Sequence, residues 1–453
     1  MARVHWIALL FFLFAYPNSA DAQRSADTEK LDSYFKELQS NDRFSGSVIL
    51  MKGDDILFQN AYGSIDKDGT PATPQSLYRV ASITKSYTSA LILRFVEQGD
   101  LSLKTTLNSY FPGIPNAEQI TIEQLLRHQS GLANFTGLQS YTDYFTAERS
   151  REEMIEHFES IETVFEPGKR SAYSNTGYVL LGYIIEEISG LSYSEALREM
   201  ITGPLGLNST YFSRSTGLGQ YEADSFIYEK GGWVPAPQTN LEILHGAAAI
   251  VSTAEEVAKF YRALFSGDIL SEGSLENMTR FEGQFGLGTI RFSFYDKAMI
   301  GHHGRIDGFQ SHSAHIVEDD VTFAILANSL NHQFNDILNG FLSITFGKEF
   351  EMPDLEQRIP VSLAEEKLER YTGIYISEDF PLHIIVSVVE GSLMAYPIGQ
   401  DAFLLTIYND REMGSEQAVI EILFDEIEAG RYRGFQFSRS GKHFNFSLID
   451  ESD

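Results

Sequence analysis

The pattern of apolar and polar residues predicts a mixed domain in which helices are inserted between segments of sheet. Alternating runs beside turn residues are typical of strands, whereas apolar positions that recur every three or four residues are typical of helices. Residues 86–97 are apolar on most of their surface and end at Gly99, which predicts a helix buried at the centre of the domain. The other predicted elements are a helix over 28–39, a hairpin of strands over 46–50 and 56–61, helical segments from Ile122 to about Pro204 that include one over 178–188, a helix over 254–265 capped by Ser252 or Thr253, and strands over 314–317 and 321–327.

The sequence pattern changes after about residue 349, from mixed helical and strand signals to a charged segment followed by strand signals. Residues 349–365 are rich in charge and contain Pro353 and Pro360, which predicts a linker. Evenly spaced alternating runs follow, and they predict a small antiparallel β-barrel. These runs cover 382–388, 403–408, 419–424, 435–437 and 444–448. The predicted organisation is a first domain over 23–348, the linker, and a β-rich domain over 366–453.

Residues 1–22 are predicted to be a signal peptide. Arg3 precedes an apolar run of about eleven residues, Trp6 to Tyr16, and Ala20-Asp21-Ala22 supplies a cleavage pattern. A helix needs ~20 apolar residues to span a bilayer, so this run is too short for a permanent anchor. We expect cleavage after Ala22 and export to the periplasm or the outside of the cell. An uncleaved segment that tethers the protein to the membrane is the alternative.

Composition narrows the classes of function. The chain has 63 Asp and Glu against 34 Lys and Arg, a net charge of −29 that repels nucleic-acid phosphates and anionic lipid headgroups. Its 453 residues include no cysteine, which excludes disulfides, thiolate zinc sites and a cysteine nucleophile. The G-x-S-x-G and H-E-x-x-H patterns of two other hydrolase classes are absent as well.

Three short motifs occur in the order expected of a serine acyl-transfer site: Ser82-Ile83-Thr84-Lys85, Tyr173-Ser174-Asn175 and His302-His303-Gly304. Each pattern also arises by chance, since residues 33–36 read S-x-x-K and residues 16–18 read Y-x-N. The hypothesis therefore depends on the order of the motifs and on the elements that carry them.

Ser82 and Lys85 are predicted to lie about one turn apart at the start of the buried helix. Burial lowers the pKa of a lysine, which lets Lys85 act as a base or stabilise a nearby tyrosine anion. The helix N-terminus offers backbone N–H groups to a developing oxyanion. The alternative is that Ser82 is an ordinary N-cap.

Tyr173 and Asn175 fall on a short connection between a turn at 166–168 and the next helix. Such connections commonly carry catalytic groups. Tyr173 is predicted to pass a proton between Ser82 and the leaving group, and Asn175 to bind a substrate amide. The alternative is that Asn175 caps the helix and Tyr173 only packs.

The third motif lies in a strand-like segment, 301–309, that contains several glycines. The glycines are expected to let a substrate backbone approach, and a backbone N–H of the segment to complete an oxyanion hole. Four histidines crowd this region, but neighbours on a strand point to opposite faces, so His302 and His303 diverge, as do His312 and His315. No metal site is therefore expected.

Taken in order, these segments resemble the serine β-lactamase-related family, which includes class C β-lactamases, D-alanyl-D-alanine carboxypeptidases, D-aminopeptidases and certain esterases. The resemblance covers roughly residues 30–345. It implies an α/β fold of the β-lactamase/transpeptidase type, an antiparallel sheet flanked by helices with an inserted helical subdomain. The tail from about Leu368 is similar to lipocalin-like domains attached to some members. The segments that carry the resemblance are 79–85, 120–132, 165–168 with 173–175, 246–253 and, for the tail, 371–375.

The resemblance implies that Ser82 is the acylated nucleophile and that Lys85 and Tyr173 share the base role. His302 stands where many members have a lysine that holds a substrate carboxylate, and a histidine is charged only in part at neutral pH, so efficient β-lactamase activity is less expected. His303 is expected to narrow the site, and Arg305 to supply the missing cation or to face solvent. The substrate-binding set is Asn175, His302, His303, Gly304 and Arg305.

We therefore expect an exported serine hydrolase, a peptidase or esterase, that forms an acyl-enzyme on Ser82. Its substrate is expected to be a small molecule or peptide, most simply a D-amino-acid peptide or a small ester, and no cofactor is implied. The alternative function is a binding or sensor protein that holds penicillin or peptidoglycan fragments without turnover.

Overall fold

The computed structural model describes residues 26–213, 222–229 and 232–350, and most of 352–449. Within the last range the residues left out are 353–354, 356–359, 381, 390, 398–401, 416–419, 426, 429 and 440–441. The predicted signal peptide and most of the central part of the predicted linker lie outside the described residues. Within the described part of the chain, no helix combines the length and the apolar character needed to cross a membrane.

The first unit is built on an eight-stranded sheet whose main path runs β2-β1-β11-β10-β9-β8. Neighbours on this path are antiparallel, and the predicted hairpin appears as β1 and β2. The predicted strands over 314–317 and 321–327 lie within β10 and β11, except that Val317 already belongs to a short turn of helix. The strands are β1 (Phe44–Lys52), β2 (Asp55–Tyr62), β5 (Phe226–Glu229), β6 (Gly232–Pro235), β8 (Ile290–Phe294), β9 (Lys297–Ile306), β10 (Phe309–Ile316) and β11 (Val321–Leu330).

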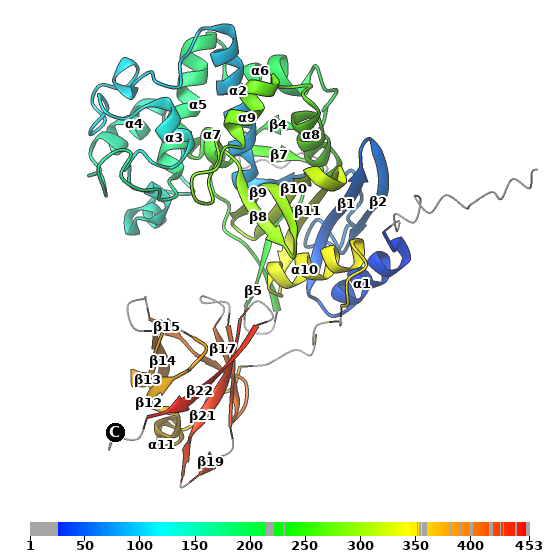
Figure 1. Cartoon of the computed structure of the whole chain (residues 1–453), viewed down its shortest axis with the longest axis vertical. Helices are drawn as coiled ribbons and strands as arrows, with labels where there is room; N and C mark the ends of the chain where they lie inside the picture. Colours follow the sequence, from blue (N-terminus) through cyan, green and yellow to red (C-terminus); the bar gives the residue numbers. More distant parts are fainter. Residues whose placement is uncertain are drawn as a thin grey trace, which may run out of the picture.

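Helices cover both faces of this sheet (Figure 1). Because side chains alternate along a strand, β1 feeds two cores: Val48 and Leu50 pack with residues of α1 and α10, whereas Ile49 and Met51 join a larger core with α2 and α8. The cap of α8 is Thr253, whose hydroxyl accepts a hydrogen bond from the Glu256 backbone N–H at 3.2 Å. The four helices are α1 (Thr28–Ser40), α2 (Thr84–Gln98), α8 (Ala254–Ser266) and α10 (Phe334–Thr345).

A mainly helical part lies between α2 and α8 in the sequence, as predicted. Its central helix, α5, is buried over the apolar run 176–185 and ends before Gly190. A three-stranded sheet of order β3-β7-β4 joins this part to the segment that precedes Ser82. The elements of this part are α3 (Ile122–Leu126), α4 (Arg151–Glu159), α5 (Asn175–Ser189), α6 (Tyr193–Leu197), α7 (His245–Ala248), β4 (Tyr211–Phe212) and β7 (Ile250–Ser252). The strand β3 (Tyr78–Arg79) precedes α2 in the sequence, and the helix α9 (Glu272–Met278) follows α8.

The C-terminal unit is a nearly closed, nine-stranded antiparallel barrel of order β15-β14-β13-β12-β22-β21-β18-β17-β16 (Figure 1). Its interior is filled by large side chains such as Tyr375, Phe424 and Phe435, which are at most 1% exposed. The predicted run 403–408 divides into two short strands at Leu405. The similarity to lipocalin-like domains stays a prediction. The strands are β12 (Gly373–Ile376), β13 (Ile384–Val389), β14 (Ser392–Pro397), β15 (Phe403–Leu404), β16 (Thr406–Ile407), β17 (Glu412–Ser415), β18 (Ile420–Phe424), β21 (Gly434–Arg439) and β22 (Lys442–Leu448).

Candidate active site

Ser82 lies at the centre of a constellation drawn from three segments of the chain. It belongs to a single 3₁₀ turn, η1 (Ala81–Ile83), that leads directly into α2. Its hydroxyl does not cap the helix; instead Oγ accepts hydrogen bonds from Lys85 Nζ at 3.1 Å and from the Tyr173 hydroxyl at 2.7 Å. The preceding residue, Ala81, has a φ of +50°, a backbone conformation that costs a residue with a Cβ roughly 1–3 kcal/mol. Ser82 is therefore held in a strained turn between two polar side chains.

Lys85 is fully buried, with an exposed fraction of 0%. Its Nζ donates to three acceptors: Ser82 Oγ, Asn175 Oδ1 at 2.7 Å and the Ala247 carbonyl oxygen at 2.9 Å. Three acceptors match the three N–H groups of an ammonium. Burial nevertheless lowers the pKa of Lys85 well below its usual value, because the charged form loses its hydration. The site thus holds a lysine whose neutral form is far more accessible than on a surface.

Tyr173 completes the contacts of the nucleophile. Its ring lies 4.8 Å from Lys85 Nζ, measured to the ring centroid, so the two side chains touch as well as sharing Ser82. Burial raises the pKa of the Tyr173 phenol, and the hydrogen bond with Ser82 opposes that rise only in part. The phenol is therefore protonated in the resting site and donates to Ser82.

Asn175 is the first residue of α5, and the N-cap is Ser174. The Asn175 side chain is occupied at both ends, since Oδ1 accepts from Lys85 and Nδ2 donates to Thr136 Oγ1 at 2.7 Å. Its backbone N–H donates to Asn134 Oδ1 at 2.9 Å. The alternative that Asn175 caps the helix does not account for these side-chain contacts. They hold Asn175 beside Lys85 and leave one amide proton of Nδ2 without a partner among them, where a substrate can accept it.

The β9 edge lies against the nucleophile turn. A Cβ built on Gly304 would lie 2.5 Å from the Val80 carbonyl oxygen and 2.8 Å from the Ser82 nitrogen. Gly304 is therefore needed because β9 closely approaches the chain's own backbone, and the expected approach of a substrate backbone stays a prediction.

The same edge supplies main-chain donors. Ile306 and Phe309 pair across a two-residue turn that joins β9 to β10. In an antiparallel pair, every second residue directs its N–H group to the partner strand. Counting back from Ile306, the N–H groups of residues 303 and 305 therefore point away from β10. β8 pairs with β9 only as far as Gly301. The expected oxyanion hole stays a prediction, and its candidate donors are the Ser82 amide and the Arg305 amide next to Gly304.

His302 faces the same side of β9 as Gly304 and is only 1% exposed. Its Nδ1 lies 2.5 Å from the His303 carbonyl oxygen. A carbonyl only accepts, so Nδ1 carries the proton. Burial lowers the pKa of His302 well below its usual value, and the nearby Lys85 and His303 act in the same direction. The ring is therefore neutral, with Nε2 as a hydrogen-bond acceptor, and is not the partly charged group that the sequence predicts.

The structure does not bring the side chains of His303 and Arg305 to Ser82. Alternation along β9 places both side chains on the opposite face, where the His303 ring lies 5.8 Å from Phe292 and 6.3 Å from His312, centroid to centroid. The His303 ring nevertheless lies 5.7 Å from the His302 ring. Arg305 is exposed. The main-chain carbonyl of His303 accepts from His302, and the Arg305 amide is a candidate donor to an oxyanion. Among the described residues, no three metal-ligating side chains come together.

Several groups that complete the site escaped sequence reasoning. His128 is buried behind Tyr173 with ring centroids 4.5 Å apart, and its Nδ1 accepts from the Ser174 N–H at 3.2 Å. Burial lowers the pKa of His128 to about 3, so this ring is neutral too. Phe285 packs on His128 as well, with ring centroids 4.9 Å apart, and lies 6.4 Å from the Tyr173 ring. A signal for His128 existed, since it stands in the segment 120–132 that carries the family resemblance.

With this geometry established, comparison with known proteins identifies the family. A sequence model described as Beta-lactamase matches residues 31–342. The chain belongs to the beta-lactamase family. It is 26% identical over 381 residues to penicillin-binding protein 4* of Bacillus subtilis, which covers 77% of this chain and 83% of that protein. It is thus a serine hydrolase of this family, related to penicillin-binding proteins.

Two solved structures extend the relationship. A D-amino acid amidase from Ochrobactrum anthropi, complexed with D-phenylalanine, is 26% identical with a TM-score of 0.62, covering 70% of this chain and 98% of its own. The octameric penicillin-binding protein homologue from Pyrococcus abyssi is 25% identical with a TM-score of 0.65, and it covers 93% of this chain and 99% of its own. The β-lactamase/transpeptidase-type fold is confirmed.

Proposed function

We propose that the protein hydrolyses amide or ester bonds through an acyl-enzyme on Ser82, with a D-amino-acid amide or peptide, or a small ester, as substrate. The observation that carries this proposal is the double contact of Ser82 Oγ with Lys85 Nζ and the Tyr173 hydroxyl. A hydroxyl between a desolvated amine and a phenol is an activated nucleophile with a proton path on each side.

The directions of the pKa shifts divide the roles of Lys85 and Tyr173. Tyr173 starts protonated, so it cannot take the Ser82 proton in the first step. Neutral Lys85 takes that proton as Oγ forms its bond to the substrate carbonyl, and the Ser82 and Arg305 amides hold the resulting oxyanion. Collapse breaks the bond to the leaving group, which takes a proton from Tyr173, and Lys85 then reprotonates the phenol. In the second half of the reaction, water attacks the acyl-enzyme ester on Ser82. Lys85 takes the proton of the water, Tyr173 returns a proton to Ser82 Oγ, and the acid product leaves.

His302 supports a substrate without a carboxylate beside the scissile bond. A neutral ring with a free Nε2 acceptor complements an N–H group, whereas a carboxylate needs a donor or a cation. A D-amino-acid amide or peptide presents such N–H groups. The structural similarity to a D-amino acid amidase supports the same class.

A matched pair of substrates tests this proposal. We expect kcat/KM for a D-alanyl-D-alanine peptide with an amidated C-terminus to exceed that for the free carboxylate by at least about tenfold, which is ~1.4 kcal/mol of transition-state stabilisation. The Ser82→Ala variant is the control and should hydrolyse neither. Equal or inverted preference would refute the proposed preference for a substrate without a carboxylate beside the scissile bond. A single acylation burst without turnover on amides, esters and β-lactams would favour the sensor function instead.

Export is also a proposal, supported by the pattern of residues 1–22. Edman sequencing of the protein recovered from the periplasm or medium of expressing cells should begin at Gln23. Recovery in the cytoplasm with an intact Met1 would contradict it.

A further inference from the structure

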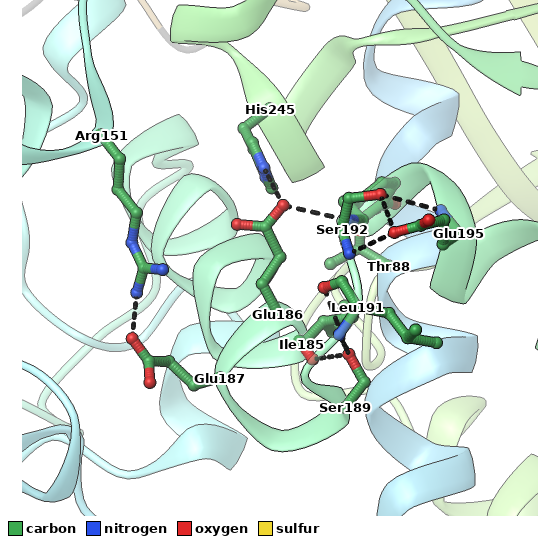
Figure 2. Close-up of polar contacts among 11 residues, drawn as sticks. Thr88, Arg151, Ile185, Glu186, Glu187, Ser189, Leu191, Ser192, Glu195 and His245 are labelled. Carbon is green, nitrogen blue, oxygen red and sulfur yellow. Dashed lines mark hydrogen bonds and ion pairs between the residues drawn. The ribbon is translucent and has the colours of Figure 1, made fainter.

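Glu186 and His245 form a mostly buried pair whose described polar contacts do not include Ser82, and Figure 2 shows the two side chains pointing toward each other. His245 Nε2 lies 3.4 Å from Glu186 Oε1, and their side chains are 8% and 20% exposed. A carboxylate only accepts, so Nε2 carries the proton of this long hydrogen bond. The same oxygen of Glu186 accepts from the Tyr193 backbone N–H at 2.9 Å. The pair therefore ties α7, which begins at His245, to α5, which carries Glu186.

The backbone at His245 is strained. Its φ is +37°, a conformation that persists in a residue with a Cβ only where the surroundings enforce it. The imidazole is enclosed by the rings of Tyr183, Tyr193 and Phe212, at centroid distances of 4.7, 5.2 and 5.1 Å. A Cβ on Gly182 would lie 2.2 Å from His245 Nδ1, so α5 has a glycine where the ring needs space. The side chain is thus held in place from four sides.

The helix that His245 begins presents its carbonyl groups to α2. The Ala247 oxygen accepts from Lys85 Nζ at 2.9 Å, and the Gly246 oxygen accepts from Thr88 Oγ1 at 2.6 Å. α5 supplies the other acceptor, Asn175 Oδ1, about 16 Å along the helix from Glu186. Two of the three acceptors of Lys85 therefore come from the two elements that the Glu186–His245 pair joins.

We propose that Glu186 and His245 are positioning residues that fix the Ala247 carbonyl on Lys85, and so set the alignment of the base with Ser82. The inference rests on the proposed function, since it assigns Lys85 the base role. Among the described residues, five ionisable rings lie around Lys85 besides Ser82 and Asn175. Its Nζ lies over Tyr173 and Tyr178, and its charge acts on His128, His302 and His303.

The test compares acylation rates across pH for variants of the full chain. Glu186→Ala and His245→Asn remove the link, and asparagine tolerates the positive φ. Each should lower the acylation rate constant about tenfold with little change in KM, since small displacements of a catalytic group are costly. Loss of an acceptor favours the neutral amine, so the acid limb of the rate profile should move to lower pH.

Controls separate positioning from stability. Glu186→Gln keeps an acceptor for both partners and should stay within about threefold of wild type. Glu187→Ala, at the next residue and paired with Arg151 on the surface, should match wild type in rate and acid limb (Figure 2). If His245→Asn does not fold, the comparison of Glu186→Ala with Glu186→Gln carries the test.

Two negative results have different meanings. If a fluorophosphonate labels the wild-type protein at Ser82, and Glu186→Ala and His245→Asn match the wild type in acylation rate and acid limb, the positioning role alone is overturned. Lower melting temperatures with unchanged rates at 25 °C also overturn it. A wild-type protein that forms no adduct overturns the proposed function instead.

Discussion

At the scale of single residues, Lys85 decides what the site can do. It is buried, contacts the nucleophile and is held by acceptors from two helices. Tyr173 stands on the other side of Ser82 with its pKa shifted in the opposite sense. The two directions keep an amine ready to accept a proton and a phenol ready to donate one, which is the pairing that acid–base catalysis requires.

The pH dependence of acylation should separate the two residues. Since the charged form of Lys85 is inactive as a base, the rate should rise with pH through the pKa of Lys85, at a pH well below 10.5. Tyr173→Phe keeps the ring and should lower the plateau about 10²–10⁴-fold while the acid limb remains. Lys85→Met should abolish the limb together with most of the rate. A limb that survives in Lys85→Met and vanishes in Tyr173→Phe would reverse the assignment.

Motif order was sufficient to select Ser82, Lys85, Tyr173 and Asn175 as one group, since the structure brings all four side chains together. Their chemical roles stay predictions. The sequence could not predict the neutral tautomer of His302, since that state depends on burial and on one carbonyl. Main-chain groups such as the Ala247 oxygen have no sequence signature at all. The side chains of His303 and Arg305 were predicted to lie in the site because both residues are adjacent in sequence to His302 and Gly304. Side chains alternate along a strand, so both point to the opposite face of β9.

At the scale of elements, the contact of β9 with η1 forms the donor side of the site. Gly304→Ala should therefore reduce acylation by at least ~100-fold, because the added methyl group must displace the Val80 and Ser82 backbone. The overpacked variant should also lose about 1–3 kcal/mol in its free energy of unfolding. Rates and urea unfolding check both expectations.

Gly273→Ala is the matched control for that substitution. Gly273 lies in α9, and a Cβ there meets nothing within 4 Å. The Gly273→Ala variant should have an unchanged acylation rate and a slightly higher free energy of unfolding, because alanine has a higher helix propensity than glycine. A fully active Gly304→Ala variant would contradict the close approach of β9.

Long elements with a clear period were predictable, such as α2, α5 and α8. The strands β3, β4 and β7 were not, because runs of two or three residues have no period to detect. In the barrel, residues 403–408 have the alternating pattern of one strand, but the run changes its pairing partner at Leu405, since β15 pairs with β14 and β16 pairs with β17. Tertiary pairing, rather than local pattern, sets these boundaries.

At the scale of the whole molecule, buried neutral histidines link stability to pH. His128, His312 and His315 are at most 4% exposed, and burial lowers their pKa values to about 3, 3 and 4. Below the unfolded value of 6.5 the unfolded chain binds protons that the folded protein does not, so stability falls as pH falls from 6.5. Each residue should contribute a loss of about 1 kcal/mol between pH 7.5 and 5.5.

Urea unfolding at the two pH values measures this loss. His315→Gln should reduce the difference, while between pH 7.5 and 8.5 these residues should contribute none. A free energy of unfolding that is equal at pH 7.5 and 5.5 would contradict the buried neutral state.

The most direct test of the acyl-enzyme is intact-protein mass spectrometry after exposure to a fluorophosphonate. The account predicts a single adduct on the wild-type protein, located at Ser82 by peptide mapping, absent from Ser82→Ala and formed much more slowly in Lys85→Met. No adduct on the folded wild-type protein, or equal labelling of Ser82→Ala, would contradict it.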